Sequence, residues 1–208
     1  NTKLVLISAT SWDADKTLIY GFNHKNFNKN NRIISYGSCT VNAFVCIANF
    51  INNNFSIIDN DVNIIHNIPE YKLKNNFTLN RKFCTLEKSG PNLLKYLNKT
   101  NFNVNYTLVP YSGPSIIDFR FKIKKNITKS SFLKKIKKAI DQGVLKNLYN
   151  IVDNDNGPEE HNLSSYSAVI VKESIKVINN HIYFSCYFDN ENSVNRYYDL
   201  AEFMSHKI

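Results

Sequence analysis

The most apolar segment of the chain begins shortly after a glycine. Residues 39–52, read as Cys-Thr-Val-Asn-Ala-Phe-Val-Cys-Ile-Ala-Asn-Phe-Ile-Asn, place apolar side chains nearly all round a helix. Such a helix is typical of the core rather than of a half-exposed surface. Gly37 interrupts the chain before it, and Ser38 is a good N-cap. The pattern predicts a buried helix with Cys39 in its first turn.

The second half of the chain has a β pattern. Apolar and polar residues alternate there, as they do in strands that bury one face. Residues 56–69, in contrast, mix isoleucine pairs with aspartate and asparagine and show no clear period. The predicted strands cover residues 104–109, 116–123, 166–178 and 181–188.

Two further helices are predicted. Ser89-Gly90-Pro91 is a helix-start signal. Proline is tolerated in the first turn of a helix, because the backbone N–H groups there have no partner within the helix. An amphipathic helix begins after Ser130 or Ser131 and ends at Gly143. Together these elements predict an α+β chain forming one two-lobed domain over residues 1–208. A mainly helical lobe would cover about 1–102, and an antiparallel β-rich lobe about 103–208.

Cys39 is the candidate nucleophile. Unpaired backbone N–H groups and the helix dipole lower the pKa of a thiol at a helix N-terminus and favour the thiolate. A cysteine can equally be a small apolar residue at the start of a core helix. The helix pattern alone leaves both interpretations open.

The composition suggests a source rather than a mechanism. Asparagine, isoleucine, lysine and tyrosine are frequent and only 6 residues are glycine, which indicates an AT-rich genome such as that of a parasite, a protist or a large DNA virus. No apolar run is long enough for a transmembrane helix. Six Asn-x-Ser/Thr sequons would permit glycosylation in a secreted protein, but asparagine is so common that several arise by chance. The compartment stays open between secretion, a virion or occlusion body, and an infected host cell.

The four cysteines do not require a disulfide framework. Cys39 and Cys46 lie two helical turns apart, about 10 Å, and cannot bridge each other. Either could pair with Cys84 or Cys186, within one molecule or between molecules. No cysteine and histidine spacing suggests zinc, and no cofactor is implied.

A cluster of lysines is the largest charge feature in a chain of net charge +9. A solvated helix face explains it without any function. The alternative is a surface that binds an acidic protein, a nucleic acid or an anionic membrane. The candidate binding residues are Lys124, Lys125, Lys134, Lys135, Lys137 and Lys138.

Residues 37–43, Gly-Ser-Cys-Thr-Val-Asn-Ala, resemble the nucleophile motif of papain-like cysteine peptidases, in the branch that carries Gly-Ser-Cys-Thr-x-Asn-Ala. The order of elements is also similar, with the nucleophile helix first and a β-rich part after it. Residues 166–171 resemble the strand that carries the family's catalytic histidine. The resemblance covers about residues 30–190 and implies a papain-like two-lobed fold.

The departures from that family bear on activity. Its chemistry needs a histidine to take the thiol proton and a glutamine six residues before the cysteine to donate to the oxyanion. Those positions here hold Ser167 and Ile33. Loss of one oxyanion donor alone costs roughly 3 kcal/mol of transition-state stabilisation. His161, six residues before Ser167, is the best substitute base.

The resemblance and its departures together predict a degenerate member of that family, with Cys39 as a vestige. We then expect a non-enzymatic structural or assembly protein that binds copies of itself or another protein, for example a viral structural or occlusion-body protein. One alternative is an active cysteine peptidase using Cys39 with His161. Another is a basic adaptor that binds nucleic acid or a membrane surface through the lysine cluster. Whether the chain is an enzyme stays open.

Overall fold

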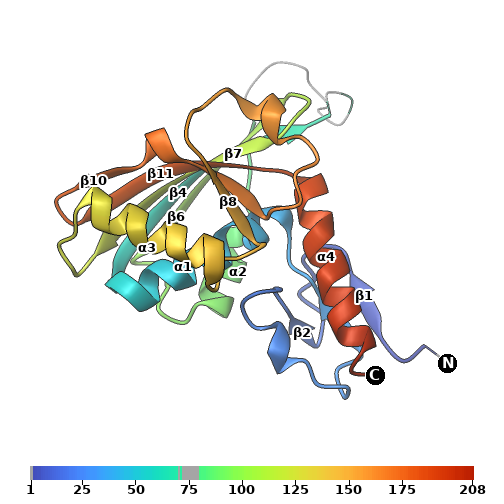
Figure 1. Ribbon diagram of the computed structural model, residues 1–208. Coiled ribbons are helices and arrows are strands. Elements are labelled where there is room, and N and C mark those ends of the chain that lie inside the picture. The colour runs from blue at the N-terminus through green and yellow to red at the C-terminus, as the bar shows by residue number, and fades with distance from the viewer. Residues whose placement is uncertain (1, 70, 72–79) are drawn as a thin grey trace.

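The computed structural model describes residues 2–69, 71 and 80–208. These residues form two β-sheets and four α-helices, which are α1 Cys39–Phe55, α2 Leu86–Leu93, α3 Lys129–Gln142 and α4 Asn190–Ser205 (Figure 1). The strands are β1 Val5–Ile7, β2 Lys16–Thr17, β3 Ile33–Ser35, β4 Ile57–Ile68, β5 Asn80–Arg81, β6 Phe102–Pro110, β7 Ser115–Ile123, β8 Tyr149–Val152, β9 Ala168–Val171, β10 Lys176–Ile178 and β11 His181–Phe188.

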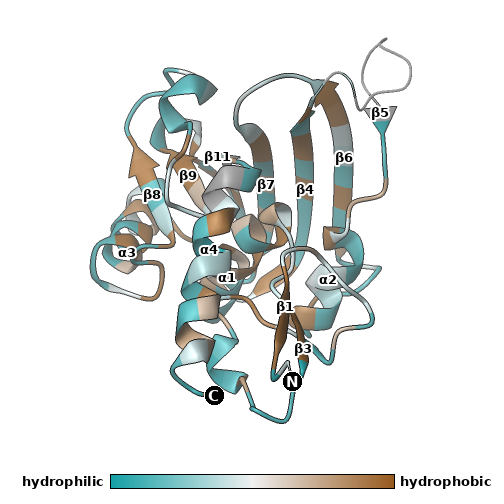
Figure 2. Cartoon of the chain, turned by 90° about the vertical axis from the view of Figure 1, so that its right-hand side faces the viewer, coloured by the Kyte–Doolittle hydropathy of each residue, from teal (hydrophilic) through white to brown (hydrophobic). Residues whose placement is uncertain are grey.

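The large sheet has eight strands in the order β5-β6-β4-β7-β11-β9-β8, with β10 paired to β11. It is mixed, because β4 pairs with β6 in parallel and with β7 in the antiparallel direction. Figure 2 shows β6, β4 and β7 side by side. Strands from before and after residue 102 therefore share one sheet. The papain-like arrangement of a helical lobe beside a β-rich lobe is wrong, and the fold is α+β around a mixed sheet. The extent of the domain stays a prediction.

Helices α1 and α3 cover one face of this sheet. The Phe44 ring of α1 stacks on Phe119 and Phe121 of β7, with ring centroids 6.1 and 6.4 Å away. The Phe132 ring of α3 lies 6.0 Å from Phe184 of β11. Along β7 every second residue is buried, as the alternation predicts. The aromatic rings between the sheet and these helices belong to the main core, which also contains Val62 and Ile64 of β4.

A small parallel sheet, in the order β1-β3-β2, leads into α1. It packs against α4 through a second core that contains Ile34, Tyr36 and Leu200. The Tyr197 hydroxyl of α4 donates to the Leu6 carbonyl of β1 over 3.1 Å. Figure 1 shows α4 beside β1, at the end of the molecule away from β10. This contact holds the C-terminal helix against the segment that enters α1.

The predicted strands at 116–123 and 181–188 and the predicted helices at 39–52 and 130–143 are confirmed within a few residues. Three elements differ. The strand predicted over 166–178 is divided into β9 and β10 by a 3-10 turn at Lys172–Ser174. Ser89-Gly90-Pro91 lies inside α2 rather than at its start, since the helix begins at Leu86. Residues 57–68, which show no clear period, form the central strand β4.

Across 2–69, 71 and 80–208, none of the helices combines the length and apolar character needed to cross a bilayer.

Candidate catalytic thiol and histidine site

The turn before α1 places Cys39 at the first position of the helix. Gly37 has φ of +89°, and a Cβ there would come within 2.8 Å of the Ile19 side chain. Glycine is therefore required in this turn. The Ser38 hydroxyl caps the helix by accepting a hydrogen bond from the Val41 N–H over 3.3 Å. Asn42 also stabilises the turn, because its side-chain amide donates a hydrogen bond to the Ser38 carbonyl over 2.9 Å.

The histidine beside this thiol is His66, near the end of β4. The Cys39 Sγ and His66 Nε2 atoms are 3.3 Å apart. The His66 Nδ1–H donates to the Asn67 carbonyl over 2.6 Å. A carbonyl can only accept, so in the neutral ring the proton sits on Nδ1 and the lone pair of Nε2 faces the sulfur. The histidine is thus held in the tautomer that can take the thiol proton.

Aromatic neighbours bury the His66 ring. The ring lies 5.6 Å from Phe188 of β11 in an edge-on arrangement and 5.7 Å from Tyr106 of β6. Cys39 is 8% exposed and His66 7% exposed. A thiol within hydrogen-bond reach of a base that a third group orients is the arrangement typical of an activated nucleophile.

Burial sets the protonation state of the pair. It raises the pKa of the Cys39 thiol to about 11, while the Thr40 hydroxyl lowers this pKa and the Asp189 carboxylate raises it. Burial also lowers the pKa of the His66 ring, against the opposing effect of the Asn67 carbonyl. The expectation that the helix N-terminus lowers the thiol pKa is therefore wrong, because the effect of desolvation outweighs the effect of the helix N-terminus. At neutral pH the pair is a thiol beside a neutral imidazole.

Hydroxyl groups surround the start of α1. The Thr40 Oγ1 atom lies 3.8 Å from the Cys39 Sγ atom. On the other side, Ser38 Oγ lies 3.3 Å from Thr85 Oγ1, which comes from the residue preceding α2. Burial raises the pKa of the nearby Cys84 thiol to about 12, and Cys39 raises it further. The thiol therefore belongs to the main hydrophobic core, with the Thr40 hydroxyl as a polar neighbour.

A cavity of about 750 Å³ lies beyond His66 along the chain, at the end of β4, and its described lining residues include neither Cys39 nor His66. One of its lining residues is Asn67, whose backbone carbonyl accepts the hydrogen bond from the His66 Nδ1–H. The volume suits a small metabolite. Its described lining residues are Asn67, Ile68, Pro69, Pro110, Tyr111, Ser112, Gly113, Asn162, Leu163 and Asp189.

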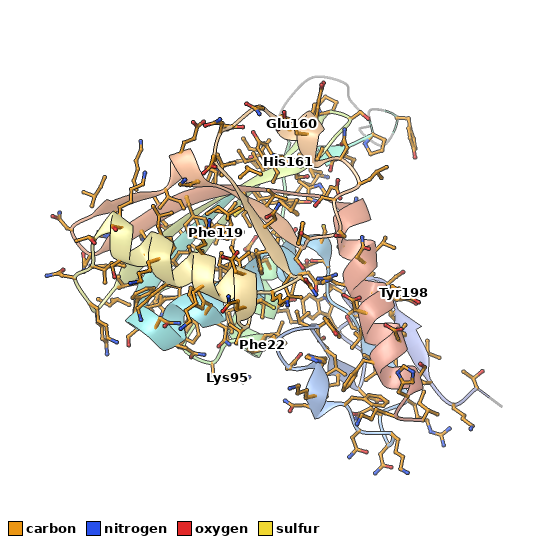
Figure 3. The ribbon with its side chains drawn as sticks, in the orientation of Figure 1. Phe22, Lys95, Phe119, Glu160, His161 and Tyr198 are labelled. Atoms are coloured by element: carbon orange, nitrogen blue, oxygen red, sulfur yellow. The ribbon has the colours of Figure 1, made fainter. Side chains whose placement is uncertain are left out.

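His161, the substitute base proposed from the sequence, is not the histidine that lies against the Cys39 sulfur. It closes the short 3-10 turn Pro158–His161, and its ring stacks on Tyr187 with the centroids 5.0 Å apart. Figure 3 shows His161 and Glu160 together on this turn above the large sheet. The role assigned to His161 depended on matching Ser167 to the histidine position of another family.

The predicted lysine cluster lies on the exposed face of α3 and the loop before it. Lys125 and Lys135 are turned toward α1, where their Nζ atoms contact the Asn54 carbonyl and side chain. Lys134 and Lys137 line a groove of about 610 Å³. Lys124 and Lys138 are exposed. Binding through these lysines stays a prediction.

All four cysteines lie in the described ranges and are free and buried. Pairing with Cys84 or Cys186 is therefore not formed in this structure. Among the described residues, histidine, cysteine and carboxylate side chains do not gather in threes as a metal site would require.

Sequence reasoning missed His66 because it treated residues 56–69 as aperiodic. The strand β4 contains a signal that would have found it. Val62, Ile64 and His66 all point inward, whereas Asn63 and Ile65 between them are exposed. A histidine that continues the buried side of a strand is a candidate for a specific partner, and here the partner is the first residue of α1.

No protein-family model matches this chain. The chain is 26% identical to the muscle glyceraldehyde-3-phosphate dehydrogenase of Jaculus orientalis over 99% of its own length and 60% of that protein. It is 25% identical to glyceraldehyde-3-phosphate dehydrogenase 3.1 of Caenorhabditis briggsae, over 99% of the chain and 64% of the relative. With glyceraldehyde-3-phosphate dehydrogenase 1 of Bacillus cereus the identity is 24%, over 100% and 66%. The chain thus spans somewhat less than two thirds of the length of these relatives.

These similarities overturn the papain-like interpretation. Relatives from a rodent, a nematode and a bacterium share the dehydrogenase name and align with nearly the whole chain. The resemblance of residues 37–43 to a peptidase motif was a short local likeness. The inferences built on it are wrong as well, namely a degenerate peptidase, an active peptidase, and a viral structural or occlusion-body protein.

Proposed function

We propose that this chain carries the thiol chemistry of a dehydrogenase that acts on an aldehyde. The contact between Cys39 Sγ and His66 Nε2, at 3.3 Å, is the observation that carries the proposal. The names of the relatives support it, because a glyceraldehyde-3-phosphate dehydrogenase acts on an aldehyde. A thiol with an adjacent base is suited to attack an aldehyde carbon.

The proposed step is the addition of Cys39 to the substrate carbonyl. The sulfur forms a bond to the aldehyde carbon, and its proton moves to His66 Nε2. The carbonyl π bond breaks, and the oxygen that carries the negative charge then takes the proton from Nε2. The product is a hemithioacetal, and the step is neither an oxidation nor a reduction. Because the pKa of free Cys39 is raised to about 11, proton removal must accompany attack, which is the role of the base.

A dehydrogenase also needs a hydride acceptor, such as a nicotinamide dinucleotide. The residues of this chain do not fit the usual phosphate-binding loop for that group. Its six glycines, at positions 21, 37, 90, 113, 143 and 157, are too far apart for Gly-x-Gly-x-x-Gly. The proposal therefore assigns to this chain the carbonyl addition alone.

Alkylation of Cys39 tests the proposal without any hydride acceptor. The protein is treated with iodoacetamide in the presence of increasing glyceraldehyde or glyceraldehyde 3-phosphate, and labelling of each cysteine is followed by peptide mass spectrometry. We expect an aldehyde to protect Cys39 while Cys46, Cys84 and Cys186 label as before. The Cys39→Ser variant identifies the protected peptide. Equal labelling of Cys39 with and without both aldehydes would show that the site does not add to them.

The lysine cluster supports a second, separate proposal of an anionic partner. Four lysines (Lys129, Lys134, Lys137 and Lys172) line the groove at the start of α3, where Asp153 is engaged by Lys172. A nucleic acid, an anionic membrane or an acidic protein would suit it. Retention on heparin that is lost when Lys134 and Lys137 are replaced by glutamine, with Lys124→Gln and Lys138→Gln as matched controls, would support this partner. Equal retention would exclude the groove.

A further inference from the structure

The groove between α3 and β8 has an apolar floor as well as its lysines. Helix α3 packs against β8, and Figures 1 and 2 both show the two elements next to each other. Leu133 of α3 and Ile151 of β8 line this groove of about 610 Å³, and both side chains are half-buried against the main core. The other described lining residues are Lys129, Ser130, Lys134, Lys137, Asp153 and Lys172. A partner that fills the groove therefore has to offer apolar surface in addition to charge.

The positive charge of the groove is only partly compensated. Lys172 forms an ion pair with Asp153 and is the main reason that the pKa of this carboxyl is lowered, whereas Lys137 lowers it least. In the ion pairs between described residues, Lys129, Lys134 and Lys137 take no part. The first turn of α3 contains no acidic residue, so the positive end of the helix adds to the charge of Lys129. Four lysines thus face one carboxylate, and the groove favours an anion.

The spacing of residues along α3 indicates the form of that anion. Lys129, Leu133 and Lys137 are four residues apart, so they follow one another along one side of the helix at intervals of about 6 Å. In an extended chain every second side chain points the same way, and the interval between such side chains is about 6.6 Å. An extended segment with an acidic, an apolar and an acidic side chain at alternate positions therefore matches this row of α3.

Two other anionic partners match the groove less well. A single-stranded nucleic acid binds largely by stacking its bases on aromatic side chains, and none of the described residues that line the groove is aromatic. A membrane surface would meet the exposed ammonium groups without reaching the half-buried Leu133 and Ile151 between them. A narrow peptide can contact both the lysines and the floor.

We infer that the groove binds an acidic protein segment in extended conformation, with the pattern acidic-x-apolar-x-acidic. The two carboxylates pair with Lys129 and Lys137, and the apolar side chain packs on Leu133 and Ile151. The inference rests on the proposed anionic partner of the lysine groove and specifies the class of that partner.

Peptide titrations at physiological ionic strength, followed by the NMR shifts of the α3 backbone amides, test the inference. The probe is the capped peptide Glu-Ser-Leu-Ser-Glu. Its isomer Glu-Glu-Leu-Ser-Ser has the same charge in a different spacing and should bind about fivefold more weakly, because one surface ion pair is lost. The peptide Glu-Ser-Ser-Ser-Glu should bind about tenfold more weakly, because the apolar contact is lost.

Charge reversal in the protein provides a matched test. In Lys129→Glu the probe should bind at least about fivefold more weakly than in the wild-type protein. One of the mixed peptides Lys-Ser-Leu-Ser-Glu and Glu-Ser-Leu-Ser-Lys should bind this variant more tightly than the wild-type protein, and that peptide gives the direction of the bound segment. Lys138→Glu changes an exposed lysine of α3 that does not line the groove, and it should leave these affinities unchanged.

Each other result overturns a defined claim. Equal binding of the probe and its isomer, or binding of no peptide while replacement of Lys134 and Lys137 by glutamine abolishes heparin retention, would overturn the acidic segment and leave the anionic partner intact. Tighter binding of a thymidine oligonucleotide or of phosphatidylserine vesicles, lost in Lys129→Glu, would replace the peptide by a nucleic acid or a membrane. Unchanged heparin retention in the glutamine variant would refute the proposed anionic partner, and the acidic segment with it.

Discussion

Ser115 Oγ holds Asn67 at two atoms. It accepts a hydrogen bond from the Asn67 N–H over 3.0 Å and donates one to the Asn67 Oδ1 atom over 2.9 Å. Asn67 in turn uses its carbonyl to bind the His66 Nδ1–H. Ser115 is buried at the start of β7, on the strand paired with β4. The Ser115 hydroxyl thus positions the Asn67 residue, and the Asn67 carbonyl in turn selects the tautomer of the His66 ring.

Replacement of Ser115 by alanine should weaken the base without removing it. The Asn67 carbonyl stabilises the protonated ring, so its displacement should lower the pKa of His66 further below its ordinary value of 6.5. The ¹⁵N shifts of the imidazole should change from a single Nδ1–H tautomer to a mixture, and Cys39 alkylation at pH 7.5 should slow by about tenfold, within the range of a general base. Ser115→Thr keeps the hydroxyl and should restore both readouts. A slower reaction with an unchanged tautomer would point to a structural effect alone.

Removal of the base itself should change how alkylation depends on pH. With a thiol pKa of about 11, the wild-type rate should rise steadily from neutral to alkaline pH. In His66→Gln the rate at pH 7.5 should fall by at least about tenfold, because a general base contributes roughly 10² to 10⁴ in rate. The two rates should converge at high pH, where hydroxide takes the proton. Labelling with iodoacetamide between pH 6 and 10 measures this, and parallel profiles at all pH values would contradict the role of His66.

Local signals in the sequence predicted much of the fold. Gly37 and Ser38 mark the start of α1 because the turn and the cap involve only neighbouring residues. The strands β7 and β11 follow their own alternation of apolar and polar residues, since each buries one face against the helices. These features need no knowledge of distant contacts.

The central strand β4 and the site could not be predicted in the same way. The half-buried positions Asp59 and Asp61 of β4 form ion pairs with Arg120 of β7. That partner lies about sixty residues away, so the segment by itself has the composition of a loop. His66 likewise gains its role only where β4 ends beside α1. The papain-like interpretation failed for a related reason, because a cysteine starting a buried helix is a short motif that different folds can contain.

Tyr149 should make a large contribution to stability through the backbone of α1. Its buried hydroxyl donates to the Ala43 carbonyl over 2.8 Å and accepts from the Ile47 N–H over 3.3 Å. Tyr149→Phe would remove these hydrogen bonds while the two backbone groups keep their partners within α1, and it should lower the free energy of unfolding by about 0.5–1.5 kcal/mol. Urea denaturation measures this. Tyr198→Phe, at a ring 65% exposed on α4 (Figure 3), should change it by less than about 0.5 kcal/mol. Equal effects of the two substitutions would contradict the assignment.

His66 should also make stability depend on pH. Burial lowers its pKa in the folded protein, whereas the unfolded chain has the ordinary value of 6.5. Between these two values the unfolded state binds more protons, so the contribution of His66 is complete above about pH 6.5 and is lost as the pH falls through the lowered folded value. The loss of unfolding free energy between pH 7 and pH 5 should be smaller in His66→Gln than in the wild-type protein.

His24 and His161 contribute with the same sign, because burial lowers their pKa values too, so the variant should keep part of the slope. His206→Gln, at an exposed position after α4, is the control and should reproduce the wild-type loss. An identical loss in His66→Gln and the wild-type protein would mean that the ring is not held neutral against Cys39.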